Sequence, residues 1–479
     1  MLTLILDCLF LESNLNPVFN GKSALHHLTS GIEGYDRIIV LHNGLVNDIP
    51  KGAKGVLVED LSAINILSVI LKEVKQSELA VIMNGGSPFY DKQFIDGMID
   101  KHRKYGADYS NSIGYPDGLV PEIITKNALK QICYLLKDDN KTDRNYLFYG
   151  ITKDINSFDI ETVISPVDMR LYKVRIGSDD AGQCILTSSI YREAKDDGYN
   201  GIVEYINNNK AVIFTLPYTV ILDITSKRLD KPIYLPELQK QSEMSLDDVE
   251  EIVSQLSNIN SSCKVILGGI GDPVLHKNWV GIVKVIVKKG FDLIIETGGI
   301  ELDESDLELL NEYSDQITFV VMLDAATPEV FSAVRGHNGL DVVIKTISLL
   351  RNKGFTVYRQ ITRLKENELE IEGFIRKKDT DNLIIRKYSN YCGFLPDRSV
   401  VDLSPVNRIP CFHLRRDIFV SADKAVPLCK YSIMSGKERG DSSSLTSIID
   451  RQRDLFKKNV AGVYPDCCKN CSDYYIFNF

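Results

Sequence analysis

The C-terminal tail of this 479-residue chain holds five of its ten cysteines. Thiolates are soft, anionic ligands, and four of them suit either a tetrahedral zinc ion or an iron–sulfur cluster. Two separated thiols and a closing Cys-x-x-Cys pair supply such a set, which we predict to be Cys411, Cys429, Cys468 and Cys471. We leave out Cys467, because adjacent residues rarely both point at one ion.

A metal-free tail is the alternative interpretation, since cysteine is common in protein cores. The clustering of the tail cysteines argues against it. In a reducing compartment, clustered thiols indicate a metal site rather than disulfides. The remaining cysteines are scattered along the chain: Cys8, Cys133, Cys184, Cys263 and Cys392.

The tail itself is short and irregular. We expect Asp417 to Val420 and Ala425 to Leu428 to form a hairpin flanked by Cys411 and Cys429. If this hairpin folds against the closing turn, the four thiols meet at one point. Metal binding would then supply stability that so small a segment cannot obtain from a core of its own.

The part of the chain before residue 200 alternates short β-branched runs with an amphipathic stretch. This pattern predicts a mostly parallel sheet with helices on both faces. The loop from Asn84 to Pro88 follows the third of these strands, where open sheets often bind ligands, although such turns more often only reverse the chain. The predicted strands are 38–41, 56–58 and 80–83, with a helix over 62–75.

A polar stretch from Glu193 to Lys210 predicts the first domain boundary. The alternation of strands and helices then restarts, and Ser245 begins a helix with Asp248 placed to complete a capping box. Repeated βαβ units of this kind form an open sheet or curl into a barrel. The predicted strands are 220–224, 265–267, 293–295, 318–323, 357–361 and 383–385.

The overall charge and hydropathy exclude two broad classes of protein. Lys and Arg number 56 against 65 Asp and Glu, so the chain lacks the excess of cations that general nucleic-acid binding requires. No run approaches the roughly 20 apolar residues of a membrane-spanning helix. We read Met1 to Cys8 as a buried strand rather than a signal peptide, because the apolar run breaks at Asp7 and has no basic leader. The sequence therefore predicts a cytoplasmic protein.

The tail segment from Pro410 to Cys429, together with the closing Cys-x-x-Cys, resembles a SPASM or twitch domain. In that family, cysteines of this kind hold an auxiliary [4Fe-4S] cluster. The resemblance therefore implies one such cluster on the four predicted ligands, with zinc as the alternative metal.

Two upstream segments resemble radical S-adenosylmethionine (SAM) barrels. Residues 268–276 resemble the Gly-Gly-Glu-Pro loop of that family, and Leu323 to Glu329 with Arg335 and Gly336 resembles its fourth-strand signature. A loop of this kind can leave backbone groups free to meet a ligand's amine, and Asp272 stands where the family has Glu. The resemblance implies a cofactor-binding set of Gly268, Gly269, Gly271 and Asp272.

The chain departs from that family at the cluster cysteines. The three family positions after the first barrel strand fall on Arg228, Pro232 and Leu235, and none of these can ligate iron. Without that cluster there is no electron donor to cleave the sulfonium, so we predict that classical radical SAM chemistry is absent. The glycine loop survives in this interpretation because its backbone tolerates no side chain, and retained SAM binding is the alternative.

The N-terminal part resembles the cytidylyltransferase branch of GT-A nucleotidyltransferases, over residues 88–91, 106–111 and 115–119. That family has an Arg-rich loop after the first strand and a metal-binding Asp after the third. Here residues 9–17 contain no Arg, and Gly86 stands in place of the Asp, although Gly21 and Lys22 match a family Gly-Lys pair. We therefore predict no triphosphate chemistry.

The three-part order resembles spirochaete proteins called the spiro-SPASM family. It implies an α/β chain with a GT-A (Rossmann-like) nucleotidyltransferase fold over 1–205, a partial TIM-like radical SAM barrel over 211–400 and a small Cys-rich SPASM domain over 401–479. The expected function is that of a degenerate iron–sulfur protein that binds a protein partner or small ligand. A residual sugar-nucleotide or SAM-binding transferase is the second hypothesis, and a zinc-stabilised scaffold is the third.

Four histidines and the single tryptophan lack the neighbouring residues that would indicate a catalytic or metal-binding site. We interpret the adjacent pair His26 and His27 as structural, His276 and His337 as hydrogen-bonded surface groups near strand ends, and Trp279 as a core residue on an amphipathic helix.

Overall fold

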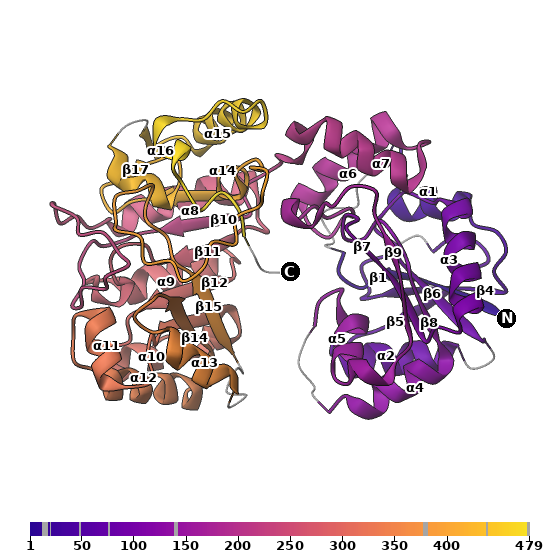
Figure 1. Cartoon of the computed structure of the whole chain (residues 1–479), viewed down its shortest axis with the longest axis horizontal. Coiled ribbons are helices and arrows are strands. Elements are labelled where there is room, and N and C mark those ends of the chain that lie inside the picture. The colour runs from indigo at the N-terminus through magenta and orange to yellow at the C-terminus, as the bar shows by residue number, and fades with distance from the viewer. Residues whose placement is uncertain are drawn as a thin grey trace. The chain divides into compact units, whose positions relative to one another are not determined.

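The computed structural model describes residues 1–11, 18–19, 21–46, 49–74, 77–137, 142–376, 382–436 and 439–476. The chain divides into two compact units, Met1–Thr215 and Leu216–Asn478 (Figure 1). Whether the second unit divides again near residue 400 stays a prediction. Most of the loop over 9–17 lies outside the described residues. Among the described helices, none has both the length and the apolar character needed to cross a membrane.

The first unit is built on a seven-stranded sheet in the order β5-β4-β1-β6-β8-β7-β9. Its strands are β1 (Leu2–Cys8), β4 (Arg37–His42), β5 (Lys54–Leu57), β6 (Leu79–Asn84), β7 (Tyr109–Ile113), β8 (Glu122–Thr125) and β9 (Ile160–Ile164). The β5-β4-β1-β6 half is parallel, and β8 is antiparallel to both neighbours. The strands predicted over 38–41, 56–58 and 80–83 are confirmed as β4, β5 and β6, and the first residues form the buried strand β1. A separate two-stranded pair joins β2 (Val18–Phe19) to β3 (Lys22–Ser23).

Helices cover this sheet, and one face packs on α2, α4 and α5 through a continuous apolar core. The helices are α1 (Ala24–Ser30), α2 (Ala63–Glu73), α3 (Lys92–Tyr105), α4 (Lys126–Leu135), α5 (Tyr146–Thr152), α6 (Ala181–Ala194) and α7 (Gly198–Asn208). The polar stretch from Glu193 to Lys210 is largely α7, whose buried face carries Tyr199, Ile202 and Ile206. The apolar residues of this stretch recur at helical spacing rather than in one run.

The second unit holds a seven-stranded, wholly parallel sheet in the order β15-β14-β13-β12-β11-β10-β16. Its strands are β10 (Thr219–Leu222), β11 (Lys264–Leu267), β12 (Leu293–Thr297), β13 (Ile317–Met322), β14 (Thr356–Arg363), β15 (Leu383–Lys387) and β16 (Asp417–Val420). Consecutive strands from β10 to β15 lie side by side, as in a half-barrel of (β/α) units. All six predicted strands of this region are confirmed.

The hairpin predicted for the tail is wrong. Strand β16 instead pairs with β10 in parallel, with Thr219 opposite Asp417 and Leu222 opposite Val420. The second half of the supposed hairpin, β17 (Ala425–Val426), pairs with β18 (Gly440–Asp441). The tail therefore adds a strand to the half-barrel sheet, which fixes the cysteine segments on either side of β16.

The helices of the second unit are α8 (Leu246–Ile259), α9 (Trp279–Lys288), α10 (Glu304–Glu308), α11 (Pro328–Arg335), α12 (Leu340–Asn352), α13 (Glu368–Arg376), α14 (Phe412–Arg416), α15 (Leu445–Val460) and α16 (Asp466–Lys469). Figure 1 shows α10, α12 and α13 gathered near β14 and β15. Helix α8 begins with the predicted capping box, in which Ser245 and Asp248 each accept from the other's backbone N–H. The start of α8 is therefore the one that the sequence predicted from Ser245 and Asp248.

Candidate functional site

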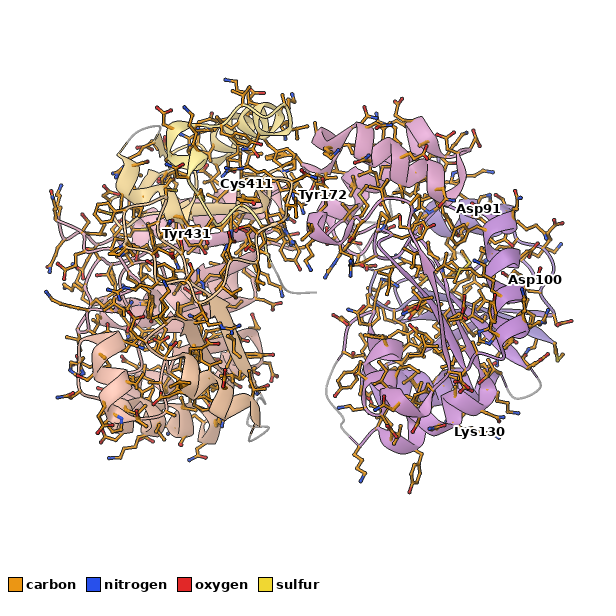
Figure 2. The ribbon with its side chains drawn as sticks, viewed as in Figure 1. Asp91, Asp100, Lys130, Tyr172, Cys411 and Tyr431 are labelled. Atoms are coloured by element: carbon orange, nitrogen blue, oxygen red, sulfur yellow. The ribbon has the colours of Figure 1, made fainter. Side chains whose placement is uncertain are left out.

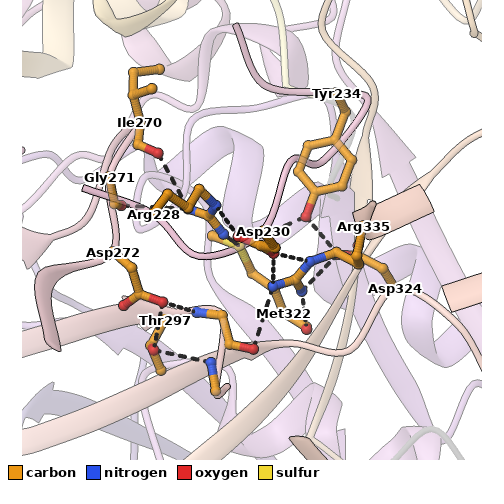
Figure 3. Close-up of polar contacts among 12 residues, drawn as sticks. Arg228, Asp230, Tyr234, Ile270, Gly271, Asp272, Thr297, Met322, Asp324 and Arg335 are labelled. Atoms are coloured by element: carbon orange, nitrogen blue, oxygen red, sulfur yellow. Dashed lines mark hydrogen bonds and ion pairs between the residues drawn. The ribbon is translucent and has the colours of Figure 1, made fainter. Parts of the chain in front are cut away.

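The mouth of the half-barrel contains a buried ion pair at the first of the three family cluster positions. The Nε atom of Arg228 lies 2.6 Å from Oδ1 of Asp230, and both side chains are almost fully buried. The same guanidinium donates to the carbonyl oxygen of Ile270 at 3.3 Å and contacts the sulfur of Met322 at 3.3 Å (Figure 3). A cation therefore occupies the space between the glycine loop and β13.

A second guanidinium completes this network. Arg335, which is 0% exposed, pairs with Asp230 and, at 3.2 Å, with Asp324. The hydroxyl of Tyr234 donates to the same oxygen of Asp324, Oδ2, at 2.5 Å (Figure 3). Burial by itself lowers the pKa of Arg335, but Tyr234 and the two carboxylates outweigh it, so the pKa lies above its ordinary value. Two cations thus balance two anions in a closed, buried group.

Asp324 is held in an unusual backbone conformation that aims it into the network. Its φ is +56°, in the left-handed region that few residues other than glycine adopt. The backbone N–H of Thr362 donates to its carboxylate at 2.9 Å, and the side chain of Asn367 donates to its carbonyl oxygen at 2.8 Å. Such strain persists only where the surroundings over-determine it. The position of Asp324 is therefore set by its neighbours.

The remaining two family cluster positions also lack iron ligands. Pro232 has no side-chain donor atom, and Leu235 packs into the apolar clusters around Tyr391 and Tyr234. An iron–sulfur cluster needs thiolate or comparable ligands at these places. The residues present at the barrel mouth do not fit such a cluster.

The predicted cofactor-binding residues lie together beside Arg228. A side chain on Gly271 would come within 1.7 Å of the carbonyl oxygen of Thr225, and one on Gly269 within 2.6 Å of Asp223. Gly268 is similarly closed by Glu296, at 2.8 Å from its Cβ. Close packing against protein therefore explains the glycines, as in the interpretation that the backbone tolerates no side chain.

The carboxylate of Asp272 is engaged within the protein. It accepts from the backbone N–H of Gly298 at 2.7 Å and from the hydroxyl of Thr297 at 3.2 Å (Figure 3). Burial raises its pKa, and Arg228 lowers it in part. A ligand amine would have to compete with these bonds.

Another group of buried charges links β12 to the tail. Lys430 lies 3.4 Å from Glu296, and Arg386 lies 3.9 Å from the same carboxylate while donating to the Tyr431 hydroxyl at 2.8 Å. Burial lowers the pKa of Lys430; Lys430 and Arg386 lower the pKa of Glu296 despite its burial. Burial also raises the pKa of nearby Asp223 to about 7. The sequence analysis did not identify these residues; charged side chains among apolar strand positions were the available signal.

A pocket of about 590 Å³ opens beside this mouth. It is lined by residues 227–229 and 274–277 and by the segment 301–303 that follows β12, with Trp279 at its wall. Its cationic and acidic side chains occur together, so charge alone does not select one class of ligand.

Hydrogen bonds draw three separate tail segments together. The backbone N–H of Cys411 donates to the side chain of Asn459 at 2.9 Å, and that of Phe412 donates to the carbonyl oxygen of Tyr474 at 2.8 Å. Arg408 donates to the carbonyl oxygen of Cys468 at 2.6 Å. Figure 2 shows Cys411 in this part of the second unit. The chain before β16 is thereby tied to the closing Cys-x-x-Cys segment.

The four predicted thiols interact with one another. Burial raises the pKa of Cys429 well above its ordinary value, and the charges of Cys411 and Cys471 raise it further. Cys468 feels the charges of Cys429 and Cys411, and its sulfur lies 3.9 Å from that of Cys467. Each of the four thiols therefore lies within electrostatic reach of others in the set.

Cys392 belongs to the same group, which corrects the expectation that it is scattered. Its thiol interacts with the thiols of Cys467 and Cys471. The residue lies on the loop after β15, so no spacing in the tail pointed to it. Cys467 likewise contacts the group, because its sulfur lies 3.9 Å from that of Cys468.

The spacing of these thiols bears on which metal they fit. Within the described parts of the chain, no three His, Cys, Asp or Glu side chains surround a single point closely enough to hold one ion. Sulfurs around one zinc ion, each about 2.3 Å from it, lie within about 4 Å of one another. A [4Fe-4S] cubane instead binds each thiolate at a different iron atom, so its ligand sulfurs lie farther apart.

In the first unit, an arginine fills the crevice at the end of β1. Arg144 lies 3.3 Å from Asp7 and is held in a two-pronged ion pair by Asp179, at 2.5 Å from its Nε. At Gly86, a Cβ would lie 2.8 Å from the side chain of Leu11 and 3.0 Å from the backbone nitrogen of Ser178. A metal-binding carboxylate at Gly86 therefore has no room.

Lys22 lies in the short strand β3, where it stands opposite Phe19 of β2. His27 is structural, as predicted: its ring contacts the carbonyl oxygen of Phe19 at 2.6 Å and the hydroxyl of Tyr191 at 2.9 Å. Its neighbour His26 donates its backbone N–H to Ser23 at the start of α1.

His276 is hydrogen-bonded but buried rather than at the surface. Its ring contacts the carbonyl oxygen of Met244 at 2.8 Å and accepts from the backbone of Asn278 at 3.0 Å. His337 is half-buried, and its Nδ1 is a buried atom with no hydrogen-bond partner among the described residues. Trp279 is buried, as predicted, and donates to Asp306 at 2.7 Å.

Comparison with known proteins identifies the central segment. Residues 226–377 match the family model described as Radical SAM superfamily. An uncharacterized protein of Treponema pallidum (strain Nichols) is 29% identical over 359 residues, which span 70% of this chain and 99% of that protein.

Two solved structures resemble parts of the chain. Streptococcus suis SuiB matches with a TM-score of 0.45 and 11% identity over 60% of this chain and 83% of its own. A cytidylyltransferase from Leptospira borgpetersenii serovar Hardjo-bovis matches with a TM-score of 0.37 and 13% identity over 44% of this chain and 96% of its own.

The half-barrel sheet and the family match agree over the same stretch of sequence. Residues 226–377 of the second unit are therefore similar to the Radical SAM superfamily. Arg228, Pro232 and Leu235 stand at the three positions where the resemblance to radical SAM barrels predicted the cluster cysteines.

Proposed function

We propose that this chain is an iron–sulfur protein whose tail binds one [4Fe-4S] cluster through Cys411, Cys429, Cys468 and Cys471, as in a SPASM or twitch domain. The observation that carries the proposal is the meeting of these thiols, drawn from segments tied together by the hydrogen bonds of Arg408 and Asn459. A zinc ion is the alternative occupant, since four thiolates also suit a tetrahedral zinc site.

The proposal includes a barrel without classical radical SAM chemistry. Arg228 and Arg335 both form ion pairs with Asp230, so opening the mouth for a cluster would leave buried charges without partners. When bound, the tail cluster supplies one-electron chemistry or structural stability, and the protein's own thiolates and the buried cations around Lys430 set its surroundings.

We also propose that the two folds bind a protein partner or small ligand without their ancestral catalysis. The pocket of about 590 Å³ beside the barrel mouth supports the small-ligand version. For the first unit, the GT-A-like assignment predicts a nucleotidyltransferase scaffold in which Arg144 takes the place of a bound cation between Asp7 and Asp179.

The test is a count of iron, sulfide and zinc per chain after anaerobic purification. One cluster gives about four iron and about four sulfide atoms per chain. Cys411→Ala should lose nearly all of this iron, whereas Cys133→Ala, a control on helix α4 of the first unit, should keep it. Zinc in place of iron, or iron that survives in Cys411→Ala, would overturn the assignment. Reversible bleaching by dithionite would distinguish a redox-active cluster from a structural one.

A further inference from the structure

The pocket beside the barrel mouth is formed by the segments that follow three neighbouring strands. Strand β11 lies between β10 and β12 in the sheet. The segment after β10 contributes 227–229, the segment after β11 contributes 274–277, and the segment after β12 contributes 301–303 and Asp306. The volume of about 590 Å³ is in the range of small-molecule sites. Among the described residues that line the pocket, none belongs to the glycine loop over 268–272, so the pocket is separate from that loop.

The charged side chains of the lining are sorted by segment. The cations come from the segments after β10 and β11, and the carboxylates come from the segment after β12. The cations are Lys227, Arg228 and Lys277, and the carboxylates are Glu301, Asp303 and Asp306. His276 is in its neutral form, because its Nε2 faces a backbone carbonyl oxygen and its Nδ1 accepts from a backbone N–H. A ligand in the pocket therefore meets positive charge from two segments and negative charge from the third.

Two of the three cations are already paired inside the protein. Arg228 forms its ion pair with Asp230, and the Nζ atom of Lys227 lies 2.8 Å from Glu243. Lys277 is exposed, and its ammonium group forms no ion pair or hydrogen bond with the residues that the structure describes. Lys277 is therefore the cation that can receive an anionic group of a ligand.

The carboxylates keep oxygen atoms that no described residue uses. Glu301 is exposed, and its carboxylate forms no ion pair or hydrogen bond within the described parts of the chain. Asp303 accepts from the backbone N–H and the hydroxyl of Ser305 through the same oxygen, Oδ1. Asp306 accepts from the indole N–H of Trp279 through Oδ2, at 2.7 Å. Each carboxylate therefore has an oxygen left for the ammonium group of a ligand.

We propose that this pocket binds a small zwitterion of the α-amino-acid type with an apolar side chain. The inference rests on the proposed function and deepens it, because it names the class of small ligand. The ligand's ammonium group meets Glu301 and Asp306, and its carboxylate meets Lys277. Its side chain covers Leu229, which is 49% exposed, and the half-buried Leu302, and so removes apolar surface from water.

Two analogues that each lack one charge test this assignment. Full-length protein is titrated with L-phenylalanine, with phenethylamine, which lacks the carboxylate, and with 3-phenylpropionate, which lacks the ammonium group. The fluorescence of Trp279 reports on binding, because the chain's only tryptophan lies in the wall of the pocket. Isothermal titration calorimetry detects binding that leaves this fluorescence unchanged. Phenylalanine should bind about fivefold more tightly than either analogue, since each analogue loses one charged contact.

Two substitutions then assign the two charged contacts. Lys277→Met should weaken the binding of phenylalanine and 3-phenylpropionate about fivefold and leave that of phenethylamine unchanged, because the amine has no carboxylate. Glu301→Gln should weaken phenylalanine and phenethylamine and leave 3-phenylpropionate unchanged. Neither side chain has a polar partner among the described residues, so both variants should fold. Lys345→Met, on α12, is the matched control and should bind all three ligands as the wild type does.

Equal affinity for the three ligands, or no binding of phenylalanine by either method, would overturn the zwitterion. Equal loss of the amine and the acid in Lys277→Met would also overturn it. SAM that binds more tightly than phenylalanine and depends on Lys277 would assign the pocket to a nucleoside instead. Iron counted in the same preparation tests the proposed cluster separately. Protein that holds iron but binds no zwitterion refutes this inference alone, and protein without iron refutes the cluster alone.

Discussion

Arg228, at the position where the resemblance to radical SAM barrels predicted the first cluster cysteine, places its Nε atom 2.6 Å from Oδ1 of Asp230. Asp230 then pairs with Arg335, which also pairs with Asp324. The sequence change at one position is therefore accompanied by a complete set of buried partners. These pairs hold the charge of Arg228 among buried partners at the mouth of the barrel.

Replacement of Arg335 should destabilise the second unit strongly. Arg335→Met leaves the carboxylates of Asp230 and Asp324 buried without their shared cation. The loss of one partner from a buried ion pair costs about 3–5 kcal/mol. Urea unfolding followed by the fluorescence of Trp279, the chain's only tryptophan, reports on this unit.

Lys345→Met is the matched control, because it removes a cation from an exposed pair with Asp341 on α12. Exposed pairs contribute about 0–1 kcal/mol, so this variant should unfold close to the wild type. Equal destabilisation of the two variants would show that the network at the barrel mouth does not stabilise the fold.

The buried carboxyl of Asp223 should make the stability of the second unit depend on pH. Burial raises its pKa from 3.8 to about 7 in the folded chain. The folded state therefore holds the proton more tightly, so the stabilisation is present at low pH and is lost as the pH rises toward 7. Asp223→Asn should remove up to about 4 kcal/mol of this dependence, at about 1.4 kcal/mol per pKa unit.

Urea unfolding at several values between pH 4 and pH 7, followed by Trp279 fluorescence, measures this effect. Asp341→Asn, at an exposed site on α12, controls for the loss of a carboxylate. Parallel pH profiles for the wild type and Asp223→Asn would contradict the raised pKa of Asp223.

The first unit should not respond to a nucleoside triphosphate. Arg144 already forms ion pairs with the carboxylates of Asp7 and Asp179, and a metal-binding side chain has no room at position 86. A ligand that binds only the folded state at 100 times its Kd stabilises it by about 2.7 kcal/mol. Differential scanning calorimetry with CTP and Mg²⁺ should therefore show no shift beyond that given by ATP and Mg²⁺. A shift specific to CTP would mean that the ancestral site still binds its ligand.

The sequence predicted most strands of both sheets, because buried parallel strands appear as short β-branched runs between helical patterns. The hairpin failed because β16 pairs with β10, nearly two hundred positions earlier, and no local pattern specifies so distant a partner. Helix α7 was missed although its signal is local. Its apolar residues recur with helical spacing inside a polar stretch.

The candidate site could be predicted from the sequence only where the spacing of the cysteines along the chain indicates it. Cys411, Cys429, Cys468 and Cys471 stand out from their clustering, whereas Cys392 joins them through a left-handed loop that a sequence does not reveal. Arg228 was identified as a departure from the family, but its partners Asp230 and Arg335 lie on different elements. Their pairing depends on the closure of the half-barrel, which single-residue patterns cannot specify.

The central claim is that metal-binding thiolates gather at the tail and that the barrel mouth has none. Its most direct test is incubation of anaerobically purified protein with SAM and dithionite, followed by chromatographic measurement of 5′-deoxyadenosine. The account predicts no 5′-deoxyadenosine above that of a protein-free control, although the tail cluster is present. Formation of 5′-deoxyadenosine in amounts that rise with protein concentration would contradict it.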